Sequence, residues 1–289
     1  VVDTLNEQGE KVGLIKVHLY RPFSAKYLLD VLPASVKKIA VLDRTKEMGA
    51  TGEPLYLDVV EVLKDKNIEI IGGRYGLGSK DTTAKDCKAV FDNLAKDKPQ
   101  HPFTIGIVDD VTHLSLPVDS SFKVKTDATQ CLFYGLGSDG TVSANKSSIK
   151  IIGDNTNLYC QAYFAYDSKK SGGATRSNLR FGPTPIRSTY YINRADFISC
   201  SVDNYVFKYD MLRNLKDGGT FLLNTSFSKD EVANYLPNRV KKQLAEKHAK
   251  LYIIDATKLA EECHMGRHTN TILQSAFFAL NQNILPLDE

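Results

Sequence analysis

Three glycines in a short segment carry the clearest chemical signal of the sequence. Gly135, Gly137 and Gly140 have the spacing G-x-G-x-x-G, between the apolar run 131–134 and the helix-like stretch 141–152. At this spacing a strand turns tightly into a helix, and backbone N–H groups can approach a phosphate. Because a helix N-terminus has unpaired N–H groups and a positive dipole, the segment predicts an anion-binding turn. The alternative is an ordinary strand-to-helix turn without a ligand, since glycine occurs in many such turns.

Charged residues after the next apolar run indicate a ligand with more phosphate than NAD. In a dinucleotide-binding domain an acidic residue after the second strand accepts hydrogen bonds from the ribose, and Asp167 follows the predicted strand 158–166. Lys169 and Lys170 come directly afterwards. Two ammonium groups near a glycine turn favour an additional ribose phosphate, which NADP and coenzyme A (CoA) both carry. A solvated loop is the alternative for a lysine pair.

Further polar residues leave two interpretations open. Arg180, Arg187 and Arg194 lie in or near a proline-containing stretch, where arginine suits a rigid anion contact or, as we favour, an interdomain salt bridge. Asn270 opens the last predicted helix, 269–281. Its amide is expected to cap the helix, and contact with a ligand is the alternative.

The first half of the chain alternates strands with helices. The predicted strands are 12–20, 38–43, 68–71 and 103–108, and the predicted helices begin at Ser24, Pro54 and Thr82 or Thr83. This order implies a parallel sheet covered by helices. The strands end in charged loops, for which we favour an interface over an active site, because no loop combines a nucleophile with a neighbouring base.

The second half repeats the alternation. The predicted strands are 131–134, 158–166, 197–202, 220–223 and 251–254, and the predicted helices are 141–152, 205–215, 229–235, 237–247 and 269–281. Ser138 or Asp139 is the expected N-cap of the first of these helices. We therefore predict an α/β protein with two domains, each a mainly parallel sheet with helices on both faces. The expected domains are 1–115 and 131–289, joined by a polar linker at 116–130.

Composition restricts the class of protein. A chain of 289 residues with 42% hydrophobic and 25% charged residues suits about two globular domains. Lys+Arg 37 against Asp+Glu 34 is too balanced to predict a nucleic-acid surface, and no apolar run reaches membrane-spanning length. Five cysteines without a C-x-x-C pair favour free thiols in a reducing, cytoplasmic setting. The polar start at Val1 suggests a piece of a longer polypeptide.

Long runs of the sequence resemble the pyruvate:ferredoxin (flavodoxin) oxidoreductase family. The similar segments are 134–153, 166–173, 179–189, 218–226 and 270–278, and in the first half 20–23, 42–47 and 72–77. The first half is similar to the family's domain related to the C-terminal domain of transketolases, and the second to its Rossmann-like, gamma-type domain. Ser143 departs from the glycine expected in the family, and 263–265 departs from a glycine-richer turn.

The resemblance implies a role in acetyl-CoA synthesis. In this family the complete polypeptide decarboxylates pyruvate on thiamine diphosphate and passes electrons through [4Fe-4S] clusters to ferredoxin or flavodoxin. The acetyl unit goes to CoA. The sequence has no cluster-binding cysteine motif and no thiamine-binding domain, so it corresponds to two central domains. These would be inactive alone, with the other domains as partners and a homodimer as the full-length state.

The resemblance also assigns the CoA-binding residues. It places Gly137, Ser138, Asp139, Gly140, Thr141, Lys169 and Lys170 at the phosphates of CoA, with Asn270 nearby. It implies no catalytic residue and no metal ligand in this chain. The alternatives are a structural and interaction fragment without affinity for CoA, a different 2-oxoacid:ferredoxin oxidoreductase, and a stand-alone NADP dehydrogenase.

Overall fold

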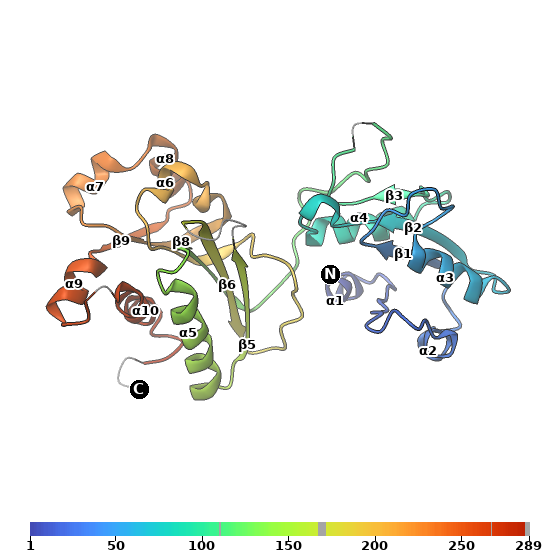
Figure 1. The fold of residues 1–289 in the computed structure, drawn as a ribbon, viewed down its shortest axis with the longest axis horizontal. Helices are drawn as coiled ribbons and strands as arrows, with labels where there is room; N and C mark the ends of the chain where they lie inside the picture. Colours follow the sequence, from blue (N-terminus) through green and yellow to red (C-terminus); the bar gives the residue numbers. More distant parts are fainter. Residues whose placement is uncertain (110, 167–171, 267, 287–289) are drawn as a thin grey trace. The chain divides into compact units, whose positions relative to one another are not determined.

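The chain forms two compact α/β units, residues 1–125 and 126–289 (Figure 1). The computed structural model describes residues 1–109, 111–166, 172–266 and 268–286. Each unit is a sheet with helices on both faces, which confirms the predicted fold class. Across the described ranges, no helix has both the length and the apolar character needed to cross a bilayer.

The first unit is a three-stranded parallel sheet in the order β1-β2-β3. Its strands are β1 (Lys38–Asp43), β2 (Glu69–Arg74) and β3 (Phe103–Thr104), and its helices are α1 (Val2–Glu7), α2 (Ala25–Val31), α3 (Pro54–Leu63), the 3-10 turn η1 (Leu77–Ser79) and α4 (Ala84–Leu94). Alternate residues of β1 pack against different helices, Val41 against α2 and α3 and Leu42 against α4. The helix starts predicted at Ser24, Pro54 and Thr83 are confirmed.

The segment 12–20 differs from the prediction. It forms no strand, and Leu14 and Leu19 are 66% and 70% exposed. Its apolar residues suit a sheet, but a strand also needs the backbone of a neighbouring strand to pair with. Within the described part of the chain this segment has no such partner.

Charged residues at the carboxyl ends of β1 and β2 bind the start of helix α3. The Asp43 carboxylate accepts hydrogen bonds from the backbone N–H groups of Leu55 at 3.0 Å and Tyr56 at 3.1 Å. Burial raises the pKa of Asp43. Glu53, which is buried, forms an ion pair with Arg74. These groups hold the sheet and α3 together.

The second unit is a six-stranded sheet in the order β5-β6-β4-β7-β8-β9. Its strands are β4 (Thr129–Leu136), β5 (Tyr159–Tyr166), β6 (Ala174–Gly182), β7 (Ala195–Cys200), β8 (Leu215–Asn224) and β9 (Lys250–Ile254). One face packs on α5 (Thr141–Asn155), α9 (Ala256–Glu262) and α10 (Thr269–Leu280). The other packs on α6 (Tyr205–Lys208), η2 (Met211–Asn214), α7 (Lys229–Tyr235) and α8 (Asn238–Glu246).

Strand β6 and helix α9 were not predicted, and the predicted helix 205–215 is two short pieces, α6 and η2. Strand β6 lies antiparallel between β4 and β5, whereas β4, β7, β8 and β9 are parallel. Because β6 is antiparallel to both neighbours, β4 and β5 run in the same direction. Their carboxyl ends therefore lie at one edge of the sheet (Figure 1).

The stretch 116–130, predicted as a linker, contributes side chains to both units. Leu116 and Phe122 are buried, and Leu116 packs with the residues around β3. Thr129 and Gln130 already belong to β4.

Arg180 in β6 is buried, which makes the predicted interdomain salt bridge wrong for this residue. It is 2% exposed, and its guanidinium donates to the side-chain oxygens of Gln130 at 3.0 Å and Gln161 at 2.9 Å. A third hydrogen bond, of 2.7 Å, goes to the backbone oxygen of Tyr190. Burial lowers the pKa of Arg180. The guanidinium therefore ties β6 to β4 and β5 within the second unit.

Replacing Arg180 should destabilise the second unit. Arg180→Met keeps most of the volume but leaves the buried oxygens of Gln130 and Gln161 without their donor. We expect the free energy of unfolding to fall by about 3 kcal/mol, measured by urea unfolding with circular dichroism. Arg194→Met, at an exposed position, should change it by less than about 0.5 kcal/mol. Equal midpoints for the two variants would contradict the structural role of Arg180.

Candidate functional site

The first two glycines of the turn are required by close packing at the end of β4. A Cβ atom on Gly135 would lie 2.5 Å from Thr141 Oγ1, so only glycine lets the start of α5 approach the strand. Gly137 donates its N–H to the backbone oxygen of Gly173 at 2.8 Å. A Cβ atom on Gly137 would stand 3.3 Å from that oxygen. The turn therefore lies against the beginning of β6.

The third glycine, Gly140, allows the final helix, α10, to pack close to the turn. Gly140 has φ +84°, a conformation that favours glycine, and is the N-cap residue of α5. A Cβ atom here would lie 2.9 Å from Asn270 Cγ. Asn270 makes no capping hydrogen bond in α10, contrary to the expected cap. The structure thus places Asn270 beside the predicted anion turn.

The Asp139 carboxylate fixes the geometry of the turn. One oxygen accepts hydrogen bonds from the Leu136 N–H and the Ser201 hydroxyl, both at 2.8 Å. The other accepts the Thr141 N–H at 2.8 Å. Asp139 therefore joins the end of β4, the start of α5 and the segment after β7. Because its oxygens are occupied by these donors, it positions the turn rather than contacting an anion, and the Thr141 N–H is occupied as well.

Other backbone donors at the start of α5 are available to a ligand. Within the described ranges, the N–H groups of Gly140, Val142 and Ser143 have no hydrogen-bond acceptor. These groups lie at the positive end of a helix of 15 residues. Ser138 adopts φ +74°, so the turn holds an unusual backbone conformation directly before the helix. This arrangement suits a phosphate oxygen.

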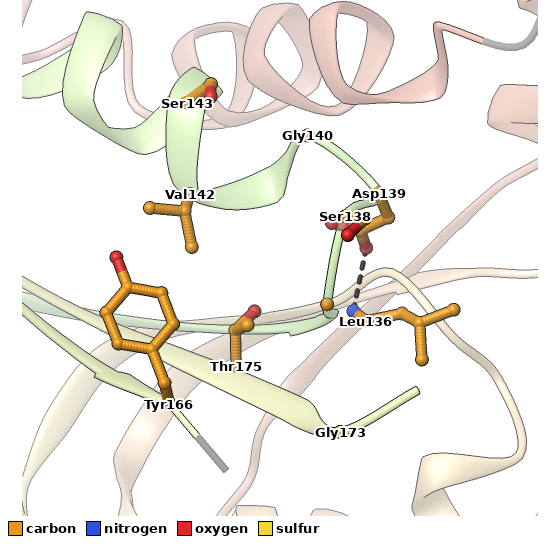
Figure 2. A pocket seen from close by; sticks show the side chains of 10 residues that line it. Leu136, Ser138, Asp139, Gly140, Val142, Ser143, Tyr166, Gly173 and Thr175 are labelled. Atoms are coloured by element: carbon orange, nitrogen blue, oxygen red, sulfur yellow. Dashed lines mark hydrogen bonds between the residues drawn. The ribbon is translucent and has the colours of Figure 1, made fainter. Parts of the chain in front are cut away.

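A pocket of about 280 Å³ lies in front of these donors. Figure 2 shows it between the first turn of α5 and the ends of β4, β5 and β6. Its lining residues are Leu136, Gly137, Ser138, Asp139, Gly140, Val142, Ser143, Tyr166, Gly173 and Thr175. Tyr166 and Thr175 were not predicted as site residues. A single Tyr or Thr has no sequence pattern, and β6 itself was not predicted.

The two predicted lysines, Lys169 and Lys170, lie outside the described residues, as does Asp167. Tyr166, the last described residue before this segment, lines the pocket, and so does Gly173, which follows the first described residue after it, Gly172.

A second pocket of about 470 Å³ lies at the same edge of the sheet, beyond the ends of β7, β8 and β9. It is lined by Ser201, Val202, Asp203, Asn224, Thr225, Ser226, Asp255, Thr257, Lys258 and Glu261. Three acidic side chains against one lysine disfavour an anion here. A phosphate is therefore expected at the first pocket.

The first pocket contains binding groups and no general acid–base pair. Among the described residues that line it there is no His or Cys, and the one carboxylate is that of Asp139. The nearby thiol of Cys200 is buried, which raises its pKa to about 12. In the described part of the chain, no group of three or more His, Cys, Asp or Glu side chains is placed to hold a metal ion. The described groups of the pocket therefore suit binding of an anion better than acid–base catalysis.

The fold and this site define a class: an α/β protein with a glycine turn that leads from a strand into the start of a helix. Comparison with known proteins identifies the family. The family model described as "Pyruvate ferredoxin/flavodoxin oxidoreductase" matches residues 130–289, and "Pyruvate:ferredoxin oxidoreductase core domain II" matches residues 1–87. The chain belongs to the pyruvate ferredoxin/flavodoxin oxidoreductase family, as the resemblance predicted.

Curated relatives are similar over the whole chain. The pyruvate:ferredoxin oxidoreductase of Moorella thermoacetica is 56% identical over 291 residues, covering 100% of this chain and 25% of the relative. The pyruvate-flavodoxin oxidoreductase of Klebsiella pneumoniae is 56% identical, covering 99% of this chain and 25% of the relative. The chain thus spans about a quarter of the length of these relatives. A pyruvate oxidoreductase subunit of Thermotoga maritima aligns in structure with 19% identity and a TM-score of 0.45, covering 56% of this chain and 81% of that one.

Removing the Asp139 carboxylate should loosen the turn. Asp139→Ala leaves two backbone N–H groups and the Ser201 hydroxyl without their acceptor. We expect the free energy of unfolding to fall by about 2 to 4 kcal/mol, measured by urea unfolding. Asp154→Ala removes an exposed carboxylate near the end of the same helix and is the matched control. Equal losses in the two variants would show that Asp139 does not hold the turn.

Proposed function

We propose that the chain is part of an enzyme that oxidatively decarboxylates pyruvate to acetyl-CoA and CO₂, passing electrons to ferredoxin or flavodoxin, and that its second unit binds CoA. The observation that carries the CoA proposal is the row of N–H groups at the start of α5 that have no acceptor among the described residues. These groups face a pocket, and Lys169 and Lys170 follow one of its lining residues, Tyr166, in the sequence.

Each predicted residue has a distinct role in this proposal. Gly140 offers its N–H to the phosphate, and Ser138 shapes the turn directly before it. Gly137, whose N–H bonds to Gly173, holds the geometry of the turn together with Asp139 and Thr141. Lys169 and Lys170 supply positive charge for the additional ribose phosphate. Asn270, beside Gly140, offers an amide to the phosphates or the ribose.

The other functions of the enzyme belong to parts outside this chain. Thiamine diphosphate, which stabilises the carbanion formed when pyruvate loses CO₂, and the [4Fe-4S] clusters are proposed to bind there. Ferredoxin or flavodoxin would be the electron acceptor, and the full-length enzyme a cytoplasmic homodimer. The five free cysteines are compatible with a reducing compartment. The first unit would contribute to assembly of the enzyme. The described charged residues at the carboxyl edge of its sheet are engaged within the unit, since Glu53 pairs with Arg74 and Asp43 accepts hydrogen bonds from α3.

Ligand preference tests the proposal. Isothermal titration calorimetry of the 289-residue chain should give tighter binding of CoA than of dephospho-CoA or NADP. Dephospho-CoA lacks the ribose phosphate that the lysines are proposed to contact. A charge-assisted contact contributes about 1.5 to 3 kcal/mol, so the difference should be about tenfold or more. Tighter binding of NADP would contradict the proposal. Stable self-association in sedimentation without CoA binding would favour a structural fragment.

The contribution of Lys169 can be measured separately. Lys169→Ala should weaken CoA binding about tenfold or more, because one charge-assisted contact to phosphate is lost. The affinity for dephospho-CoA should change less. Lys241→Ala, at an exposed position on α8, is the matched control and should bind CoA like the unmodified chain. Unchanged CoA affinity in Lys169→Ala would remove this residue from the site.

A further inference from the structure

Thr175 is a buried residue of the first pocket whose hydroxyl has no partner. Its side chain is 5% exposed and lines the pocket. Among the described residues, no group donates to Thr175 Oγ1 or accepts from it. A buried hydroxyl without a hydrogen bond is unfavourable, so its position requires a physical explanation. The backbone hydrogen bonds of β6 do not supply this explanation, because they are made to β4 on one side and to β5 on the other.

The strand register directs Thr175 toward the anion turn. Thr175 stands opposite Gly135 of β4 and opposite Tyr166 of β5. Side chains of paired residues lie on the same face of a sheet, and the Cβ direction of Gly135 points at Thr141 in the first turn of α5. The Thr175 side chain therefore lies under the N-terminus of α5. Figure 2 shows it between Tyr166 and Leu136, with its hydroxyl directed toward that first turn.

We propose that Thr175 is a further ligand-contacting residue, whose hydroxyl donates a hydrogen bond to a phosphate oxygen held at the start of α5. The ligand class is a phosphate ester or diphosphate, and the inference rests on the proposed binding of CoA. The N–H groups of Val142 and Ser143 approach the phosphate from the helix side of the pocket. Thr175 approaches it from the sheet side. The bound phosphate then supplies the acceptor that the ligand-free chain lacks.

Contact with the ligand needs a small side-chain adjustment, because Thr175 Oγ1 is closed to solvent. Rotation about χ1 of Thr175 can provide it. So can movement of the neighbouring Tyr166 ring, which is 63% exposed and little restrained by packing. No change in the backbone of β6 is required.

Thr175→Val tests the role of the hydroxyl, because valine has nearly the same shape and no polar atom. CoA binding by calorimetry should weaken about tenfold, as one hydrogen bond to a charged group is lost. Thr175→Ser keeps the hydroxyl and should stay within about threefold of the unmodified chain. The matched control is Ser177→Ala, two residues along β6. Ser177 Oγ is also buried without a partner but does not line the pocket, so CoA affinity should not change.

Thermal unfolding without ligand separates binding from structure. Because Thr175 Oγ1 has no partner among the described residues, Thr175→Val should melt at the same temperature or higher. A loss of melting temperature together with affinity would overturn the assignment and indicate a structural role. Unchanged CoA affinity in Thr175→Val, with normal binding by the unmodified chain, would overturn the role of Thr175 alone. Failure of the unmodified chain to bind CoA would overturn the proposed function, and this inference with it.

Discussion

The Asp139 carboxylate is the constraint on which the geometry of the site depends. It accepts hydrogen bonds from the end of β4 and the start of α5, which flank it in the sequence, and from Ser201 after β7, which is 62 residues away. Its position also explains how an acidic residue is compatible with the anion binding that we propose for this turn. Three donors and the positive end of α5 compensate its charge, so the remaining N–H groups of the helix can still attract a phosphate. The left-handed conformations of Ser138 and Gly140 on either side of it are held by these bonds.

Strand β6 is the second element that positions the site. At one end Arg180 is buried and bonded to residues of β4 and β5 and to Tyr190, which fixes the strand between its neighbours. At the other end Gly173 and Thr175 lie against the glycine turn. Because β6 is antiparallel, β5 ends at the same edge as β4. Tyr166, the last residue of β5, therefore lines the pocket, although β5 is an outer strand.

Local sequence signals predicted most of the elements, and tertiary contacts explain the errors. Apolar runs and helix-capping residues such as Thr83 act within a few residues, so they are visible in a single sequence. Strand β6 was missed because Ser177, Asn178 and Arg180 interrupt its apolar pattern, although all three are buried. Arg180 and Asn178 are hydrogen-bonded to residues elsewhere in the second unit. The segment 12–20 shows the opposite error, a strand that was predicted but does not form. Its apolar pattern suits a strand, but among the described residues no neighbouring strand pairs with it.

The candidate site was only partly predictable for the same reason. Glycine spacing marks a turn directly, because it reflects backbone geometry, whereas the approach of Asn270 depends on the packing of α10 against α5. The sign of the charge at each part of the sheet edge also depends on the tertiary structure, because residues of several elements meet there. Beyond β7, β8 and β9 the edge carries Asp203, Asp255 and Glu261, whereas beyond β4 it presents N–H groups that have no acceptor among the described residues. Asp255 is the N-cap of α9 and Glu261 lies within that helix, but Asp203 is far from them in the sequence, so only the fold brings it to them. Once assembled, they repel an anion from one pocket and leave the start of α5 as the favourable position for it.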